Sequence, residues 1–252
     1  MKLAGWIVAA VAMAGVQAAT VMAAQSGSHP LPTTDFSGMW LPDARRAEAW
    51  PAVLPLAPAA RRFMEGFDPT ASDPATLCMP LGTPRNMLQT GYPLEIVQTP
   101  RRLVMIIQPN LANAEVRRIP VEGRALPASP EPSWFGTSHG RWEGPTLVVE
   151  TIGLREDALV SDNGLPHSGQ LRVTERLRVV NDREHGKLLI DDIELRDPQA
   201  YLEPLKIRRY YSWAPQARAR DSTCVDALWI DKLWRDRLKE HGESARRGEA
   251  SR

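Results

Sequence analysis

The sequence has 252 residues, a formal net charge of +1 at pH 7 and 43% hydrophobic residues. A chain of this length forms one large domain or two small ones, and its apolar content is sufficient for a buried core. Its balanced charge lacks the basic excess that nucleic-acid-binding proteins and electrostatic membrane binders carry, so we expect no nucleic-acid partner.

Residues 1–24 have the pattern of a secretory signal peptide. Lys2 is their one charged residue, an apolar run follows, and Ala23 and Ala24 precede Gln25. These features correspond to the n-region, the h-region and a small-residue cleavage site. The run is short and Ala-rich, so we expect cleavage rather than stable membrane insertion. The prediction is a periplasmic or secreted protein whose residues 25–34 form a flexible lead.

The chain contains two cysteines, Cys78 and Cys224. In an oxidising, exported compartment the expected state is one disulfide between them. A two-cysteine metal site is the alternative, but neither cysteine has a second Cys or a His at ligand spacing. We therefore predict a disulfide and expect no metal and no cofactor.

The N-terminal part of the mature chain mixes elements of different kinds. Residues 35–40 read as a first strand with Trp40 as a core anchor, and residues 56–66 read as a short helix that Gly66 ends. Residues 67–92 are rich in Pro and Gly and have no clear period. We expect a long irregular segment there, which a disulfide at Cys78 would fix in place.

From residue 94 the pattern changes to short alternating segments separated by turns. The expected strands are 94–98, 102–108, 115–120, 141–142, 146–152, 171–180, 187–196 and 205–213. Segment 226–241 has an apolar stripe and predicts a helix, while 242–252 predicts a disordered tail. Short antiparallel strands must hide their edges, so we predict that residues 35–241 form a single β-barrel domain with a C-terminal α-helix. A β-sandwich is the alternative.

Two resemblances accompany this reading. Gly38-Met39-Trp40 is similar to the Gly-x-Trp pattern of lipocalins, in which a basic residue near the last strand packs on the Trp. This resemblance implies a lipocalin-like (calycin-type) barrel in which Arg208 or Arg209 has that role.

The second resemblance is to a largely uncharacterised family of secreted bacterial proteins. It rests on the runs CMPLGTPR at 78–85, EIVQ at 95–98 and WFGTSHGRWEGPTLVVETIG at 134–153, with PHS at 166–168 and TER at 174–176. It covers most of the mature chain and implies no established activity. The family's turn usually reads Glu-Gly-Asp, whereas Pro145 stands here in place of the Asp.

Titratable residues in the later segments are the candidates for chemistry. His139 and His167 lie in predicted loops beside Gly and Ser, where they could act as general acid and base; alternatively each caps a loop. These residues could also hold a metal with Glu150 and Glu175, but their spacing matches no local ligand signature.

Two glutamates interrupt apolar strand faces. Glu175 shares a face with Val173 and Leu177, and Glu150 shares one with Val148 and Ile152. A charge on an inward face needs a partner. For Glu175 the candidates are Arg85, Arg141 and Arg209. The alternative is a pair that only sets strand register, or a face that is open to water.

The predicted function is that of an exported small-molecule protein with an apolar pocket for a hydrophobic or aromatic ligand. The ligand-binding candidates are Trp134, Phe135, Trp142 and Arg85. In a catalytic version His139, His167, Glu150, Glu175 and Arg141 carry a cofactor-free acid–base step such as isomerisation, cyclisation or hydration. The alternatives are a non-catalytic periplasmic carrier and a structural envelope protein, and a homodimer is also open.

Overall fold

The computed structural model describes residues 34–89, 92–108, 113–121 and 125–218, together with Cys224, Asp231, Arg235, Asp236 and Lys239. The predicted signal peptide, most of the predicted lead and the predicted tail lie outside these residues, as does most of the helix predicted at 226–241. No helix of the described part is long and apolar enough to cross a membrane.

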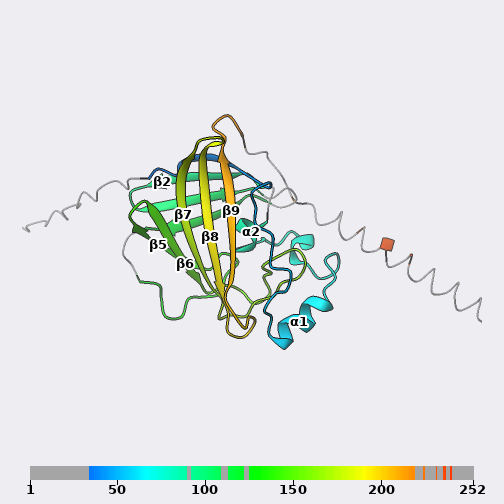
Figure 1. Ribbon diagram of the computed structural model, residues 1–252. Helices are drawn as coiled ribbons and strands as arrows, with labels where there is room; N and C mark the ends of the chain where they lie inside the picture. The colour runs from blue at the N-terminus through cyan, green and yellow to red at the C-terminus, as the bar shows by residue number, and fades with distance from the viewer. Residues whose placement is uncertain are drawn as a thin grey trace, which may run out of the picture. The chain divides into compact units, whose positions relative to one another are not determined.

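The described chain is built mainly of strands (Figure 1). Its helical elements are α1 (Pro58–Glu65), a 3-10 helix η1 (Pro74–Leu77) and α2 (Arg85–Leu88). Its strands are β1 (Gly38–Pro42), β2 (Leu94–Thr99), β3 (Arg102–Ile107), β4 (Glu115–Pro120), β5 (Thr137–Glu143), β6 (Thr146–Ile152), β7 (Arg172–Asp182), β8 (Gly186–Arg196) and β9 (Leu205–Trp213).

The nine strands form one antiparallel sheet in the order β4-β3-β2-β1-β9-β8-β7-β6-β5. The sheet curls until its two edge strands approach each other. Arg117 of β4 donates from Nε to the Ser138 hydroxyl of β5 across this seam, at 3.3 Å. The predicted antiparallel β-barrel is therefore confirmed, and the fold is not a β-sandwich.

Aromatic side chains fill the barrel end where β9 finishes, which we call the aromatic end. Trp40 is fully buried and meets Trp213 edge to face at 5.0 Å between ring centroids. The Lys187 ammonium lies 4.3 Å from the Trp213 ring centroid and 5.2 Å from that of Trp40. The basic residue on Trp40 is thus Lys187, and the expectation of Arg208 or Arg209 was wrong. Lys187 precedes Leu188, which pairs with Ser212, so it lies at the height of Trp213.

Helix α2 packs against inward-facing side chains at the opposite end, which we call the plug end. All four of its residues are buried. Asn86 donates to the Glu115 carboxylate at 3.0 Å, and the Tyr211 hydroxyl donates to the Met87 carbonyl at 3.1 Å. The Arg209 Nε donates to the Leu88 carbonyl at 2.7 Å. These bonds hold α2 to the barrel wall on two sides.

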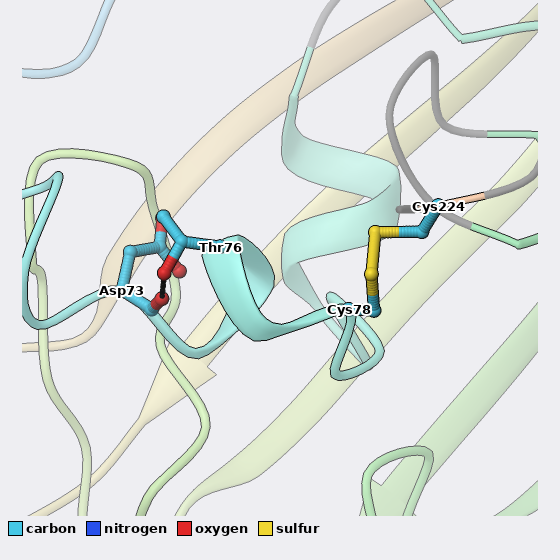
Figure 2. The surroundings of a disulfide bond; sticks show 4 residues. All are labelled: Asp73, Thr76, Cys78 and Cys224. Carbon is cyan, nitrogen blue, oxygen red and sulfur yellow. Dashed lines mark hydrogen bonds between the residues drawn. A yellow bond between two sulfur atoms is a disulfide. The ribbon is translucent and has the colours of Figure 1, made fainter. Parts of the chain in front are cut away.

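The predicted disulfide is confirmed between Cys78 and Cys224, which are 146 residues apart in the sequence (Figure 2). The segment before it is more ordered than the irregular prediction for 67–92, because Asp73 begins the 3-10 helix η1. The Asp73 carboxylate accepts from the Ala75 N–H at 3.0 Å. The backbone carbonyl of Asp73 accepts from the Thr76 hydroxyl at 2.7 Å (Figure 2). The predicted helix at 56–66 is confirmed as α1.

Candidate functional site

Glu175 faces the barrel interior, as its strand pattern indicates, and it is completely buried. Its carboxylate accepts two hydrogen bonds from the Arg117 guanidinium, one of them at 2.7 Å from Nη1. None of the predicted partners Arg85, Arg141 and Arg209 is the right one. Arg117 comes from β4, which only closure of the barrel brings near β7.

Hydroxyl groups complete the surroundings of the Arg117–Glu175 pair. The Arg117 Nη2 donates to the Thr151 hydroxyl at 2.8 Å, and that hydroxyl lies 2.8 Å from the Ser138 hydroxyl. The pair therefore keeps most of its hydrogen-bonding capacity satisfied away from water, which a buried ion pair requires.

Asp191 is a second buried carboxyl beside this pair and is not among the residues predicted from the sequence. Its cross-strand partners are Leu177 and Arg209, whereas Glu175 pairs with Ile193. Asp191 and Glu175 are thus diagonal neighbours on the inner face. Both Asp191 carboxyl oxygens are buried without a hydrogen-bond partner among the described residues. Burial, and then the charge of Glu175, raise the pKa of Asp191 well above its usual value.

Asp191 and Arg117 could have been identified from the same pattern as Glu175, a charged residue that alternates with apolar residues along a strand. Asp191 alternates with Leu189 and Ile193, and Arg117 alternates with Ile119, in strands whose buried face carries these positions. Three charged residues on inward faces would have predicted an interior polar cluster without naming its pairs.

His139, Arg141 and Glu150 lie on the outer face of the barrel wall. His139 is the cross-strand partner of Glu150 and belongs to strand β5, so the predicted loop at this position was wrong. Arg141 and Glu150 form an exposed ion pair at 2.9 Å. Because Val149 pairs with Glu175, the next residue Glu150 must point to the opposite side of the sheet. The structure does not bring these three residues together with Glu175.

The four predicted ligand-binding residues are dispersed. Trp142 stacks on the buried Phe36 at the aromatic end, with 5.5 Å between ring centroids. Arg85 is buried in an ion pair with Asp73, at 2.6 Å between Nη2 and Oδ2. Trp134 stacks under the Arg155 guanidinium, 5.0 Å from its ring centroid, and Phe135 follows it as a half-buried loop residue. Trp142 and Arg85 thus have packing and ion-pairing roles.

His167 lies in a rigid loop at the plug end. The Tyr201 hydroxyl donates to the carbonyl of the preceding residue, Pro166, at 2.8 Å. On the other side, Asp197 accepts from the Ser168 N–H at 2.6 Å and from its hydroxyl at 2.8 Å. The buried Asp197 also accepts from the N–H groups that open the 199–200 turn. The backbone on both sides of the imidazole is therefore fixed.

The imidazole of His167 is buried, with 6% of the residue exposed. Nδ1 lies 2.9 Å from the Ser168 carbonyl oxygen, which can only accept, so Nδ1 donates and Nε2 holds the lone pair. Nε2 is shielded from water and has no hydrogen-bond partner among the described residues. Burial lowers the pKa of His167, although the Ser168 carbonyl and the charge of Asp197 oppose this effect. The group is a neutral base at neutral pH.

A cavity of about 520 Å³, which we call the His167 pocket, adjoins this imidazole. Helix α1 contributes Ala59, Ala60 and Phe63 to its wall, and Leu159 and Pro166 add further apolar surface. Glu156, Asp157 and Ser168 supply polar groups. This volume lies within the range of small-molecule sites, and apolar walls with a few polar groups are typical of them.

Across the described part of the chain, His, Cys, Asp and Glu form no group of three or more that could hold a metal ion. In comparisons with known proteins, the chain matches no protein-family model and no curated protein.

Proposed function

We propose that the protein is an exported small-molecule protein that binds a hydrophobic or aromatic ligand in the His167 pocket. The proposal rests on a buried imidazole nitrogen without a hydrogen-bond partner among the described residues, on a histidine that lines a largely apolar cavity. Buried polar atoms are normally hydrogen-bonded, and a group that is not satisfied by its own chain is a candidate for a ligand contact. The disulfide and the predicted signal peptide support export.

In the catalytic version of this proposal, His167 is the acid–base group. A neutral imidazole accepts a proton from a bound ligand at Nε2 and returns it at another atom, as a cofactor-free isomerisation requires. Glu156 and Asp157 are close enough to favour the imidazolium that forms, since both raise the pKa of His167 through their charge. A ligand must first displace the side chains that shield Nε2. A carrier without turnover is the second candidate, favoured by that same shielding.

Binding is tested with N-phenyl-1-naphthylamine, an uncharged aromatic probe whose fluorescence rises in apolar sites. Ala59 is an exposed residue of the pocket wall, so Ala59→Trp fills the cavity without disturbing the core. We expect this variant to weaken probe binding at least tenfold. Ala52→Trp is the matched control, because Ala52 is exposed and lies outside this pocket. Equal binding by both variants would refute the site.

Catalysis is tested with 5-nitrobenzisoxazole, whose ring opens when a base removes its C3 proton and the N–O bond breaks to give a nitrile and a phenolate. We expect turnover that His167→Gln abolishes and His185→Gln preserves, since His185 is exposed beside Asp182. Probe binding without His167-dependent turnover would reject the catalytic version and leave the carrier.

A further inference from the structure

A second cavity at the plug end, of about 360 Å³, lies over the end of α2 and the inner face of β9. Arg209 belongs to its wall, and we call it the Arg209 pocket. Trp50, Tyr92, Gln89 and Ser161 also line it. The two rings are half-buried, and the Tyr92 hydroxyl is held by a 3.1 Å hydrogen bond to Gln89.

Arg209 differs from the other buried arginines of the described residues. Arg85 and Arg117 each donate two hydrogen bonds to one carboxylate, Asp73 and Glu175 respectively. Arg209 is also buried, with 6% of the residue exposed. Among the described residues, however, no carboxylate accepts a hydrogen bond from it. A buried guanidinium without a counter-ion is costly unless a bound anion supplies one.

The hydrogen bonds of Arg209 all go to backbone carbonyl oxygens. Nε donates to Leu88 at 2.7 Å, and Nη1 donates to Glu48 at 2.8 Å and to Arg208 at 3.2 Å. These bonds fix the guanidinium in the pocket wall. They leave Nη2 without a hydrogen-bond partner among the described residues.

The carboxyl groups nearest to Arg209 do not replace a counter-ion. Asp191 is its cross-strand neighbour, but neither of its carboxyl oxygens accepts a hydrogen bond from a described residue, and burial and the charge of Glu175 raise its pKa well above the usual value. Glu48 and Asp162 line the same pocket, but both are exposed. The Glu48 carboxylate accepts from the Arg208 N–H at 3.1 Å, and water screens its charge. The Glu48 and Asp162 carboxylates therefore lie at the rim of the pocket, whereas the buried Arg209 guanidinium lies in its wall.

We propose that the Arg209 pocket binds the carboxylate of a small aromatic acid. The carboxylate accepts from the Arg209 Nη2, and the ring of the acid lies against Trp50 and Tyr92. A guanidinium and a carboxylate form the stronger, charge-assisted kind of hydrogen bond, and a shielded site enhances it. Amphipathic rings at a pocket wall provide apolar surface for a planar ligand. This site is separate from the His167 pocket and does not depend on the function proposed there.

The test is titration calorimetry of the disulfide-bonded protein with benzoate and with benzamide, which has the same ring and no charge. We expect benzoate to bind at least tenfold more tightly than benzamide. Arg209→Gln should abolish this preference, whereas Arg208→Gln should leave it within twofold. Arg208 is the adjacent residue on the outer face, where it pairs with Asp192.

A further pair of variants keeps the test decisive if Arg209→Gln fails to fold. Ala49 is an exposed residue of the Arg209 pocket wall, so Ala49→Trp should occlude the site with Arg209 intact. We expect it to weaken benzoate binding at least tenfold. Ala59→Trp, which fills the His167 pocket, should leave benzoate binding unchanged. Equal binding of benzoate and benzamide, no benzoate binding, or benzoate binding that only Ala59→Trp removes would each overturn the proposal.

Discussion

Replacing Glu175 with glutamine leaves Arg117 as a lone cation inside the barrel. The two side chains are 0% and 1% exposed, so water does not screen the lost charge. Removing one partner of a buried ion pair costs about 3–5 kcal/mol, and the glutamine oxygen keeps one of the two hydrogen bonds. We therefore expect Glu175→Gln to lower the free energy of unfolding by an amount near the lower limit, about 3 kcal/mol. Small domains are stable by only about 5–15 kcal/mol, so such a loss is large.

Urea unfolding at pH 7, followed by tryptophan fluorescence, measures this loss. Glu150→Gln is the matched control, because its ion pairs with Arg141 and Arg172 are on the outer face and should contribute at most about 1 kcal/mol each. The double replacement Arg117→Met with Glu175→Leu removes both charges and should recover most of the stability, since Ser138 and Thr151 still bond to each other. Equal losses of stability in Glu175→Gln and Glu150→Gln would show that burial does not increase the contribution of the Arg117–Glu175 pair.

Three further predictions concern other buried groups. The folded state holds His167 neutral with a lowered pKa, so its contribution to stability is complete above about pH 6.5 and is lost as the pH falls below that value. Between pH 8 and pH 5 the melting temperature should therefore decline less in His167→Gln than in wild type, and as much as in wild type in His185→Gln. The pKa of Asp191 is raised, so Asp191→Asn should increase the free energy of unfolding at pH 7, and this increase should disappear toward about pH 4. An increase that is independent of pH would contradict the raised pKa. Replacing Cys78 and Cys224 with alanine should lower the free energy of unfolding by up to about 5 kcal/mol for a loop of 146 residues, and two labelled thiols in the unreduced protein would contradict the bridge.

Strand β5 shows where prediction from local sequence reaches its limit. The sequence predicts an extended conformation only for residues 141–142 in this region, because the glycines and serine before them are typical of a loop. Gly140 instead faces inward in the full strand Thr137–Glu143. A Cβ atom there would lie 3.0 Å from a methyl carbon of Val121 and 3.2 Å from one of Leu147. Crowding from distant segments, rather than propensity, favours glycine at this position.

The candidate site was predictable in one respect and not in another. Alternation along β7 correctly indicated that Glu175 is buried and needs a partner. It could not name Arg117, because β4 and β7 are distant in the sheet and only its curvature makes their side chains meet. Likewise, the side to which Glu150 points depends on its register with β7, and register is a property of the pairing rather than of the strand alone.

The filling of the barrel explains why both proposed sites lie at its plug end rather than in its centre. Trp40 and Lys187 occupy the aromatic end, the Arg117–Glu175 pair crosses the middle, and α2 covers the plug end. A ligand inside would have to displace paired charges, whereas the loops beyond the strand ends can form cavities without disturbing the core. One short segment contributes to both cavities: Glu156, Asp157 and Leu159 border the His167 pocket, and residues 160–162 border the Arg209 pocket. The barrel therefore acts as a frame that positions this segment, and in the two proposals the ligand would contact the loops that the barrel supports together with Arg209 of β9.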